Sequence, residues 1–303
     1  MKLIAENISK TIRGKKILSE ISLELEGGKI YGFTGPNGSG KTMLFRALSG
    51  LMSVDSGIIR WNGGVLRRDF SVLPSLGIIL ENVSLYSNLT GFQNLKYLAD
   101  IKGKIHNKEI REALKRVGLD PDDRRTYRKY SLGMKQRLGI ANAILHDPEL
   151  LILDEPTNGL DPIGIAEVRN FIKNLSVERG KTILISSHIL SEISLLADDI
   201  GIIDHGVLLE ESSMEELEKK NRKYIQLQVS DIPKASLILE RQFHVTDYAV
   251  QDEHNLRLYD TALDMAAINK ALVVQDVAVI SSQICNDTLE DYFKQITGGA
   301  GIA

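Results

Sequence analysis

The chain has 303 residues, of which 43% are hydrophobic and 25% charged, and its formal net charge is −3. This composition is typical of a soluble, well-cored protein, and the length allows one large domain and a smaller one. The near-neutral charge does not indicate nucleic acid as the main partner, and the single cysteine, Cys285, excludes an internal disulfide.

Membrane crossing and secretion both lack a sequence signal. No apolar run approaches the roughly 18 residues that a transmembrane helix needs. The N-terminal segment reaches an acidic residue, Glu6, too soon for a secretory signal peptide. We therefore expect a cytoplasmic protein, which would depend on another polypeptide for a membrane path if it serves transport.

The first two thirds of the chain alternate between strand and helix patterns. Segment 1–30 predicts short strands joined by glycine-containing turns, and a strand over 29–34 enters a glycine-rich loop that opens a helix over 41–51. Further strands are expected at 57–61 and 76–80, and a helical stretch at 91–143, broken near 103 and across 120–130. Apolar runs at 150–153, 182–186 and 200–203, the first two joined by a helix over 161–179, predict parallel strands buried on both faces.

After the charged segment 214–223 the pattern changes. The expected order is strand, helix, two strands, helix and strand, over 224–229, 233–241, 244–250, 256–259, 263–272 and 277–281, followed by a last helix over 288–296. We therefore expect an α/β domain over 1–220 and a small α+β C-terminal module over 221–303.

The glycine-rich loop has the spacing of a phosphate-binding P-loop: Gly35-Pro36-Asn37-Gly38-Ser39-Gly40-Lys41-Thr42. Glycines let backbone N–H groups turn towards phosphate oxygens, and the following helix directs its positive end at the same anion. Lys41 is expected to reach the β- and γ-phosphates, and the Thr42 hydroxyl to hold Mg²⁺. The loop predicts a nucleoside triphosphate but does not distinguish kinases, GTPases and transport ATPases.

Two acids and a histidine follow buried strands further along the chain. Asp154 is expected to orient the Mg²⁺ shell, and Glu155 to act as general base for the attacking water. A single acid at a strand end is often only a solvated surface residue. That explanation fits a pair of acids downstream of a P-loop much less well. His188 follows another core strand and can bond the γ-phosphate, although a lone histidine is more often a surface or capping residue.

The segment Tyr130-Ser131-Leu132-Gly133-Met134 precedes a predicted helix that runs to about residue 145. Ser131 and Gly133 open this helix, whose first N–H groups are free to bind an anion. A serine at this position is more commonly an N-cap alone.

At these residues the chain resembles the ATP-binding cassette family, over roughly residues 1–215. The segment around Ser131 is similar to the family signature Leu-Ser-Gly-Gly-Gln; Ser131 and Gly133 match it and the other three positions depart. The resemblance implies a P-loop NTPase fold with a RecA-like core, an antiparallel β subdomain and a helical subdomain at about 85–145.

The resemblance also implies a dimer, homodimeric or heterodimeric, in which each ATP lies between the P-loop of one cassette and the signature of the other. His188 takes the place of the family's switch histidine, and Asp161 is the implied contact across the dimer. Glu81 stands where a glutamine associated with Mg²⁺ and coupling usually lies. Many family members have an aromatic residue just before the glycine of the first glycine-containing turn, and that residue stacks on the adenine base. This chain has Ile12 there, which can offer the base only an apolar edge.

The activity implied is ATP hydrolysis with Mg²⁺ that drives dimer closure and powers a separate membrane permease, with the chain peripheral on the inner face of the membrane. The sequence around Ser131 also resembles that of subunits of bacterial exporters for peptide antibiotics, bacteriocins and drugs. Leu85, Tyr86, Leu89 and Phe92 are either part of the permease docking surface or plain helix core.

Two alternatives remain at this point. A non-transport cassette ATPase acting on ribosomes or DNA commonly joins two cassettes in one chain or carries coiled-coil insertions, and this chain has neither. A small-molecule P-loop kinase would leave Ser131, Gly133 and His188 unexplained.

Overall fold

The computed structural model describes residues 1–80, 85–103, 105–220, 223–286, 292–293 and 296–297. The chain divides into two compact units, one built mainly from Met1–Met214 and the other from Glu215–Gln295. Each unit has its own hydrophobic core.

A six-stranded sheet forms the centre of the first unit, in the order β10-β9-β3-β8-β7-β6. Its strands are β3 (Ile30–Thr34), β6 (Leu76–Ile79), β7 (Leu150–Asp154), β8 (Thr182–Ser187), β9 (Asp199–Asp204) and β10 (Val207–Ser213). All neighbours are parallel except β9 and β10. Every residue of β3, β7 and β8 is buried, as expected where layers cover both faces of a parallel sheet.

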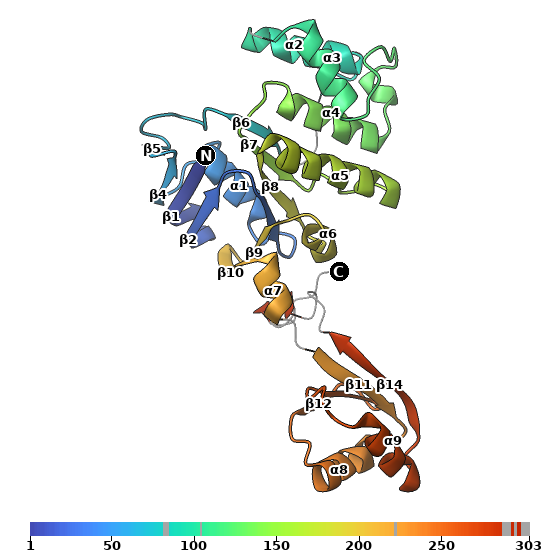
Figure 1. Cartoon of the computed structure of the whole chain (residues 1–303). Helices are drawn as coiled ribbons and strands as arrows, with labels where there is room; N and C mark the ends of the chain where they lie inside the picture. The colour runs from blue at the N-terminus through green and yellow to red at the C-terminus, as the bar shows by residue number, and fades with distance from the viewer. Residues whose placement is uncertain (81–84, 104, 221–222, 287–291, 294–295, 298–303) are drawn as a thin grey trace. The chain divides into compact units, whose positions relative to one another are not determined.

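A second, antiparallel sheet has the order β2-β1-β4-β5. It contains β1 (Lys2–Ile12), β2 (Lys15–Glu26), β4 (Ser56–Trp61) and β5 (Gly64–Val65). Helix α1 (Lys41–Ser49) lies between this sheet and the central one (Figure 1). Side chains of both sheets and of α1, including the fully buried Leu44 and Phe45, share one core cluster.

Helices α2 (Gly91–Lys102), α3 (Asn107–Arg116) and α4 (Leu132–Ile144) gather at one end of this unit, away from the antiparallel sheet (Figure 1). The short 3₁₀ helix η1 (Tyr127–Lys129) precedes α4, and α5 (Pro162–Arg179) and α6 (Leu190–Ser194) follow β7 and β8. Gly103 ends α2 with a left-handed φ of 72°, so the break predicted there is real. Within the described residues, no helix combines the length and apolarity of a membrane span. The P-loop α/β fold is confirmed.

The second unit begins with most of α7 (Met214–Lys220) and continues as β11 (Lys223–Val229), α8 (Ile232–Phe243), β12 (Tyr248–Val250), β13 (Asn255–Leu258), α9 (Met265–Val274) and β14 (Val279–Asn286). Its sheet has the antiparallel order β12-β13-β11-β14, which is the split βαβ, or ferredoxin-like, arrangement. The helix expected over 288–296 lies mostly outside the described residues.

Candidate active site

The P-loop joins β3 to α1. A Cβ on Gly35 would lie 2.0 Å from the carbonyl oxygen of Ile203, so only glycine fits this close approach. Gly40 precedes α1 with φ 112° and provides no side-chain cap, which leaves the first N–H groups of α1 directed at the loop. The loop therefore has the backbone geometry of an anion cradle.

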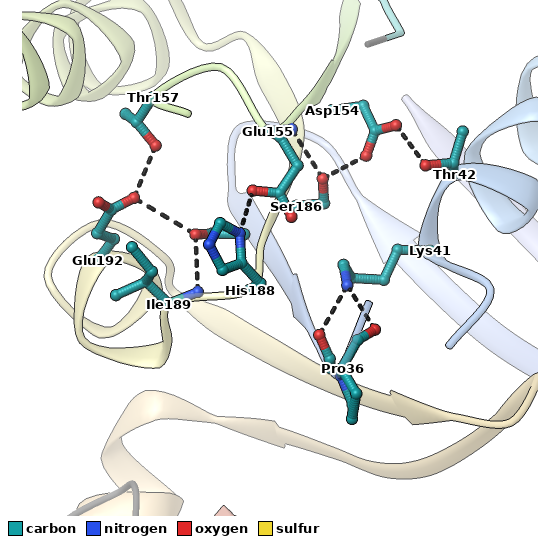
Figure 2. Close-up of polar contacts among 12 residues, drawn as sticks. Pro36, Lys41, Thr42, Asp154, Glu155, Thr157, Ser186, His188, Ile189 and Glu192 are labelled. Atoms are coloured by element: carbon teal, nitrogen blue, oxygen red, sulfur yellow. Dashed lines mark hydrogen bonds and ion pairs between the residues drawn. The ribbon is translucent and has the colours of Figure 1, made fainter. Parts of the chain in front are cut away.

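Lys41 places its ammonium inside this cradle. Its Nζ donates to the carbonyl oxygens of Gly35 at 2.7 Å and Pro36 at 3.2 Å (Figure 2). The residue is only 6% exposed, and burial lowers the pKa of Lys41, while the carboxylates of Glu155 and Asp154 act in the opposite direction. A bound phosphate would supply the negative charge that this buried cation favours.

Asp154, the last residue of β7, is held from two sides (Figure 2). Thr42 Oγ1 donates to its Oδ2 at 2.6 Å, and Ser186 Oγ donates to its Oδ1. A carboxylate and a hydroxyl side by side are the oxygen ligands that Mg²⁺ uses together with phosphates and water. The described residues contain no cluster of three or more His, Cys, Asp or Glu that could hold a metal by itself.

Glu155 and His188 form a pair beside Asp154. Glu155 has a left-handed φ of 49°, so the chain turns sharply after β7 and directs this side chain away from Asp154. Its backbone N–H donates to Ser186 Oγ at 2.9 Å, which secures the turn. His188 Nδ1 lies 2.8 Å from Glu155 Oε2 (Figure 2). An ionised carboxylate only accepts hydrogen bonds, so with Glu155 ionised the Nδ1 of His188 is the donor in this contact.

A cavity of roughly 630 Å³ lies over the P-loop. Its lining comprises the P-loop and its carboxylates together with the β1–β2 turn: Ile12, Arg13, Lys15, Ile17, Asn37, Gly38, Ser39, Gly40, Lys41, Thr42, Met43, Asp154 and Glu155. Within the described part of the chain, the buried hydroxyl of Ser39 has no hydrogen-bond partner, which is consistent with a polar ligand at the loop. The residues present therefore fit a nucleoside triphosphate with Mg²⁺.

Arg13 and Lys15 also line the cavity, although the sequence predicts only Ile12 from this turn as a site residue. Ile12 pairs with Lys15, and Arg13 and Gly14 form the two-residue turn between them, with φ values of 49° and 79°. The sequence signal that could have pointed to Arg13 is its place directly before Gly14. The two central residues of a hairpin turn lie at its tip, where their side chains are available for contact with a ligand.

Gly35, Pro36 and His188 adjoin this cavity's residues but are not part of its lining. Three further predicted residues also lie outside the lining. Ser131 is the N-cap of α4, and its Oγ accepts from the N–H of Met134 at 3.2 Å. Asp161 is the N-cap of α5, and its Oδ1 accepts from the N–H of Gly164 at 3.0 Å. Gly133 lies in the first turn of α4, close to Leu160. Glu81 lies outside the described residues.

Comparisons with known proteins agree with this geometry. A model of the ABC transporter family matches residues 18–158. The chain is 45% identical over 299 residues to the bacitracin transport ATP-binding protein BcrA of Enterococcus faecalis, with 98% of this chain and 97% of the relative covered. The chain belongs to the ABC transporter family.

Other proteins similar to this ABC ATPase are also named as parts of transporters. It is 45% identical over 205 residues to the lantibiotic transport ATP-binding protein SrtF of Streptococcus pyogenes, covering 67% of this chain and 87% of the relative. Among solved structures, cbiO1 from Clostridium perfringens, part of the ABC transporter complex cbiONQ, is 25% identical with a TM-score of 0.65 and covers 80% of this chain and 96% of that one.

A dimeric ATP-binding cassette in a post-hydrolysis state, bound to ADP and Pi, shares the fold with a TM-score of 0.63 and 21% identity, over 70% of this chain and 98% of that one. This likeness shows the fold, and the family match together with the BcrA relative shows that the protein is an ABC ATPase, an ATP-binding subunit of a transporter. Neither a kinase nor an ATPase of ribosomes or DNA is favoured.

Proposed function

We propose that this ABC ATPase powers the export of a peptide antibiotic of the bacitracin or lantibiotic kind through a separate membrane permease, at the cytoplasmic face of the membrane. The observation that carries the substrate class is the 45% identity to bacitracin transport ATP-binding proteins of two species, Enterococcus faecalis and Bacillus licheniformis. In both cases the similarity covers 98% of this chain, so it includes the C-terminal module as well as the cassette.

In this proposal the triphosphate of ATP lies in the P-loop, contacted by Lys41 and by the backbone of Gly35–Gly40. Thr42 and Asp154 would hold Mg²⁺, which neutralises phosphate charge when bound. Glu155 takes the proton of the attacking water, and His188 orients Glu155 through the 2.8 Å contact of its Nδ1.

The signature residues are proposed to serve a second cassette. Ser131 and Gly133 begin α4 but do not line the cavity over the P-loop of their own chain, as far as the described residues show. The positive N-terminal end of α4 is therefore available to bind the γ-phosphate of the ATP that the partner cassette holds. Asp161 would contact the partner at the same interface. A second copy of this chain or a different cassette would fill that place.

A docking surface for the permease is proposed at the start of α2. Leu85, Leu89 and Phe92 are half-buried and Tyr86 is 50% exposed, and this partial exposure supports a docking surface rather than plain helix core. Tyr86 is fixed rather than loose, because its backbone N–H donates to the buried Asn94 at 2.8 Å and its ring packs edge-on against Tyr97. A rigid, partly apolar surface of this kind suits contact with another protein.

Deletion of the gene in its host is expected to increase sensitivity to bacitracin. The wild-type gene should restore resistance, as should Lys173→Ala on the exposed surface of α5, whereas Lys41→Ala should not, because it removes the cation that binds the phosphates. The measurement is the minimal inhibitory concentration for each strain. Unchanged sensitivity of the deletion strain would show that the substrate class is wrong, even if the purified protein hydrolyses ATP.

Arg13 is expected to hold the adenine base. A guanidinium plane can stack on a nucleobase, and the turn places Arg13 at the cavity beside Ile12. Arg13→Ala should raise the Kd of ATP roughly threefold to thirtyfold and leave the Kd of tripolyphosphate unchanged, since that ligand has no base. Arg13→Tyr should recover ATP affinity. Equal losses for both ligands would instead assign Arg13 to the phosphates.

A further inference from the structure

A second carboxylate lies behind the Glu155–His188 pair and does not line the cavity. Glu192, on α6, accepts a hydrogen bond from Thr157 Oγ1 at 2.6 Å and another from Ser187 Oγ at 3.3 Å, both at its Oε2 (Figure 2). Thr157 is 7% and Ser187 1% exposed. The two hydroxyls are thus sheltered from water, where hydrogen bonds to a carboxylate are strong and an unmade bond is costly.

These bonds join two segments that both belong to the hydrolytic site. Thr157 follows Glu155 in the turn after β7, and this turn continues through Asn158 and Leu160, whose N–H groups donate to the carbonyl oxygens of Glu155 and Thr157 at 3.2 and 3.1 Å. It ends at Asp161, the N-cap of α5. The residue that Glu192 contacts therefore lies between the proposed general base and the proposed contact with the partner cassette.

The other segment carries the switch histidine. Ser187 and Ile189 flank His188, and Ser187 Oγ both donates to Glu192 and accepts from the N–H of Ile189 at 3.0 Å. The backbone is therefore tied on both sides of His188. Together with the direct contact between His188 and Glu155, the bonds form a closed ring that runs through Thr157 and Glu192 (Figure 2).

We propose that Glu192 is a positioning residue that holds His188 and the turn at 155–161 as one unit, so that a displacement of that turn by the partner cassette reaches the histidine. The proposal rests on the proposed function of Glu155 and His188. Among the described residues, Glu192 is not part of the cavity lining, and its hydrogen bonds from Thr157 and Ser187 come from residues outside that lining. Its removal should therefore affect the hydrolytic step and leave ATP binding intact.

The test compares steady-state ATP hydrolysis by the purified full-length chain and its variants. Glu192→Ala should lower kcat roughly tenfold to a hundredfold, with KM for ATP within about twofold of wild type. Thr157→Val should have a similar effect, because it keeps the shape of the side chain and removes the donor. Thr157→Ser should restore most of kcat, since it keeps the hydroxyl. Ser191→Ala, on the exposed side of α6, is the matched control.

The double variant Glu192→Ala with Thr157→Val should be no slower than the slower single variant, because both changes break the same bond. A kcat for Glu192→Ala within twofold of wild type, or fully additive losses in the double variant, would overturn the proposal. If Glu192→Ala does not fold, the Thr157→Val and Thr157→Ser pair decides: equal kcat values would overturn it. A wild-type chain that binds but does not hydrolyse ATP would instead refute the proposed function.

Discussion

Glu155→Gln is expected to leave ATP binding intact and to lower ATP hydrolysis roughly 10²- to 10⁴-fold, the usual contribution of a general base. The amide has nearly the same shape as the carboxylate but cannot take a proton from water. Binding should persist because Lys41 and the loop backbone are unchanged. The measurements are kcat for phosphate release and the Kd of ATP, with the exposed Glu178→Gln on α5 as control.

The same variant should accumulate as a dimer in the presence of ATP, because the closed dimer no longer hydrolyses the ATP that holds it together. Sedimentation in the presence of ATP, compared with ADP, would detect this shift. Hydrolysis at the wild-type rate would remove Glu155 from the role of base.

Ser131→Arg is expected to abolish ATP-dependent dimerisation and to lower hydrolysis about a hundredfold, while the single chain still binds ATP. The long charged side chain would fill the space in front of the N-terminus of α4, where the partner's γ-phosphate is proposed to lie. Sedimentation of the Glu155→Gln protein with and without Ser131→Arg gives the cleanest comparison, because the parent variant should be dimeric.

Loss of the helix cap must be separated from loss of the interface. Ser131 caps α4 through the N–H of Met134, and removal of such a cap usually destabilises a protein by about 0.5–2 kcal/mol. Ser131→Ala removes the cap without adding bulk, so it should lower the Tm to a similar extent and yet keep much of the ATP-dependent dimer. Identical behaviour of the Ala and Arg variants in sedimentation would mean that the cap, not the interface, explains the result.

The sequence allows a prediction of the phosphate end of the site because its signals are local. The loop Gly35–Thr42 needs particular residue types at fixed spacing, and Asp154 and Glu155 follow an apolar run whose burial fixes where they emerge. The parallel order of β3, β7 and β8 then brings the P-loop, the two acids and His188 to one edge of the sheet. These placements needed no knowledge of side-chain contacts.

Features that depend on tertiary contacts were not predictable in the same way. Glu192 is an ordinary acidic residue in sequence, and only the fold brings it to Thr157 and Ser187. Arg13 looked like a turn residue until the hairpin placed it at the cavity. Strands β5 and β10 were missed, because β5 is only Gly64–Val65 and β10 is a largely polar edge strand.

The structure of the Glu155→Gln protein with trapped ATP and Mg²⁺ would test the shared nucleotide site most directly. The quantity to measure is which polypeptide supplies each atom within hydrogen-bond distance of the γ-phosphate. We expect Lys41 from one chain and Ser131, with the first N–H groups of α4, from its partner. A γ-phosphate contacted only by residues of a single polypeptide would contradict the account.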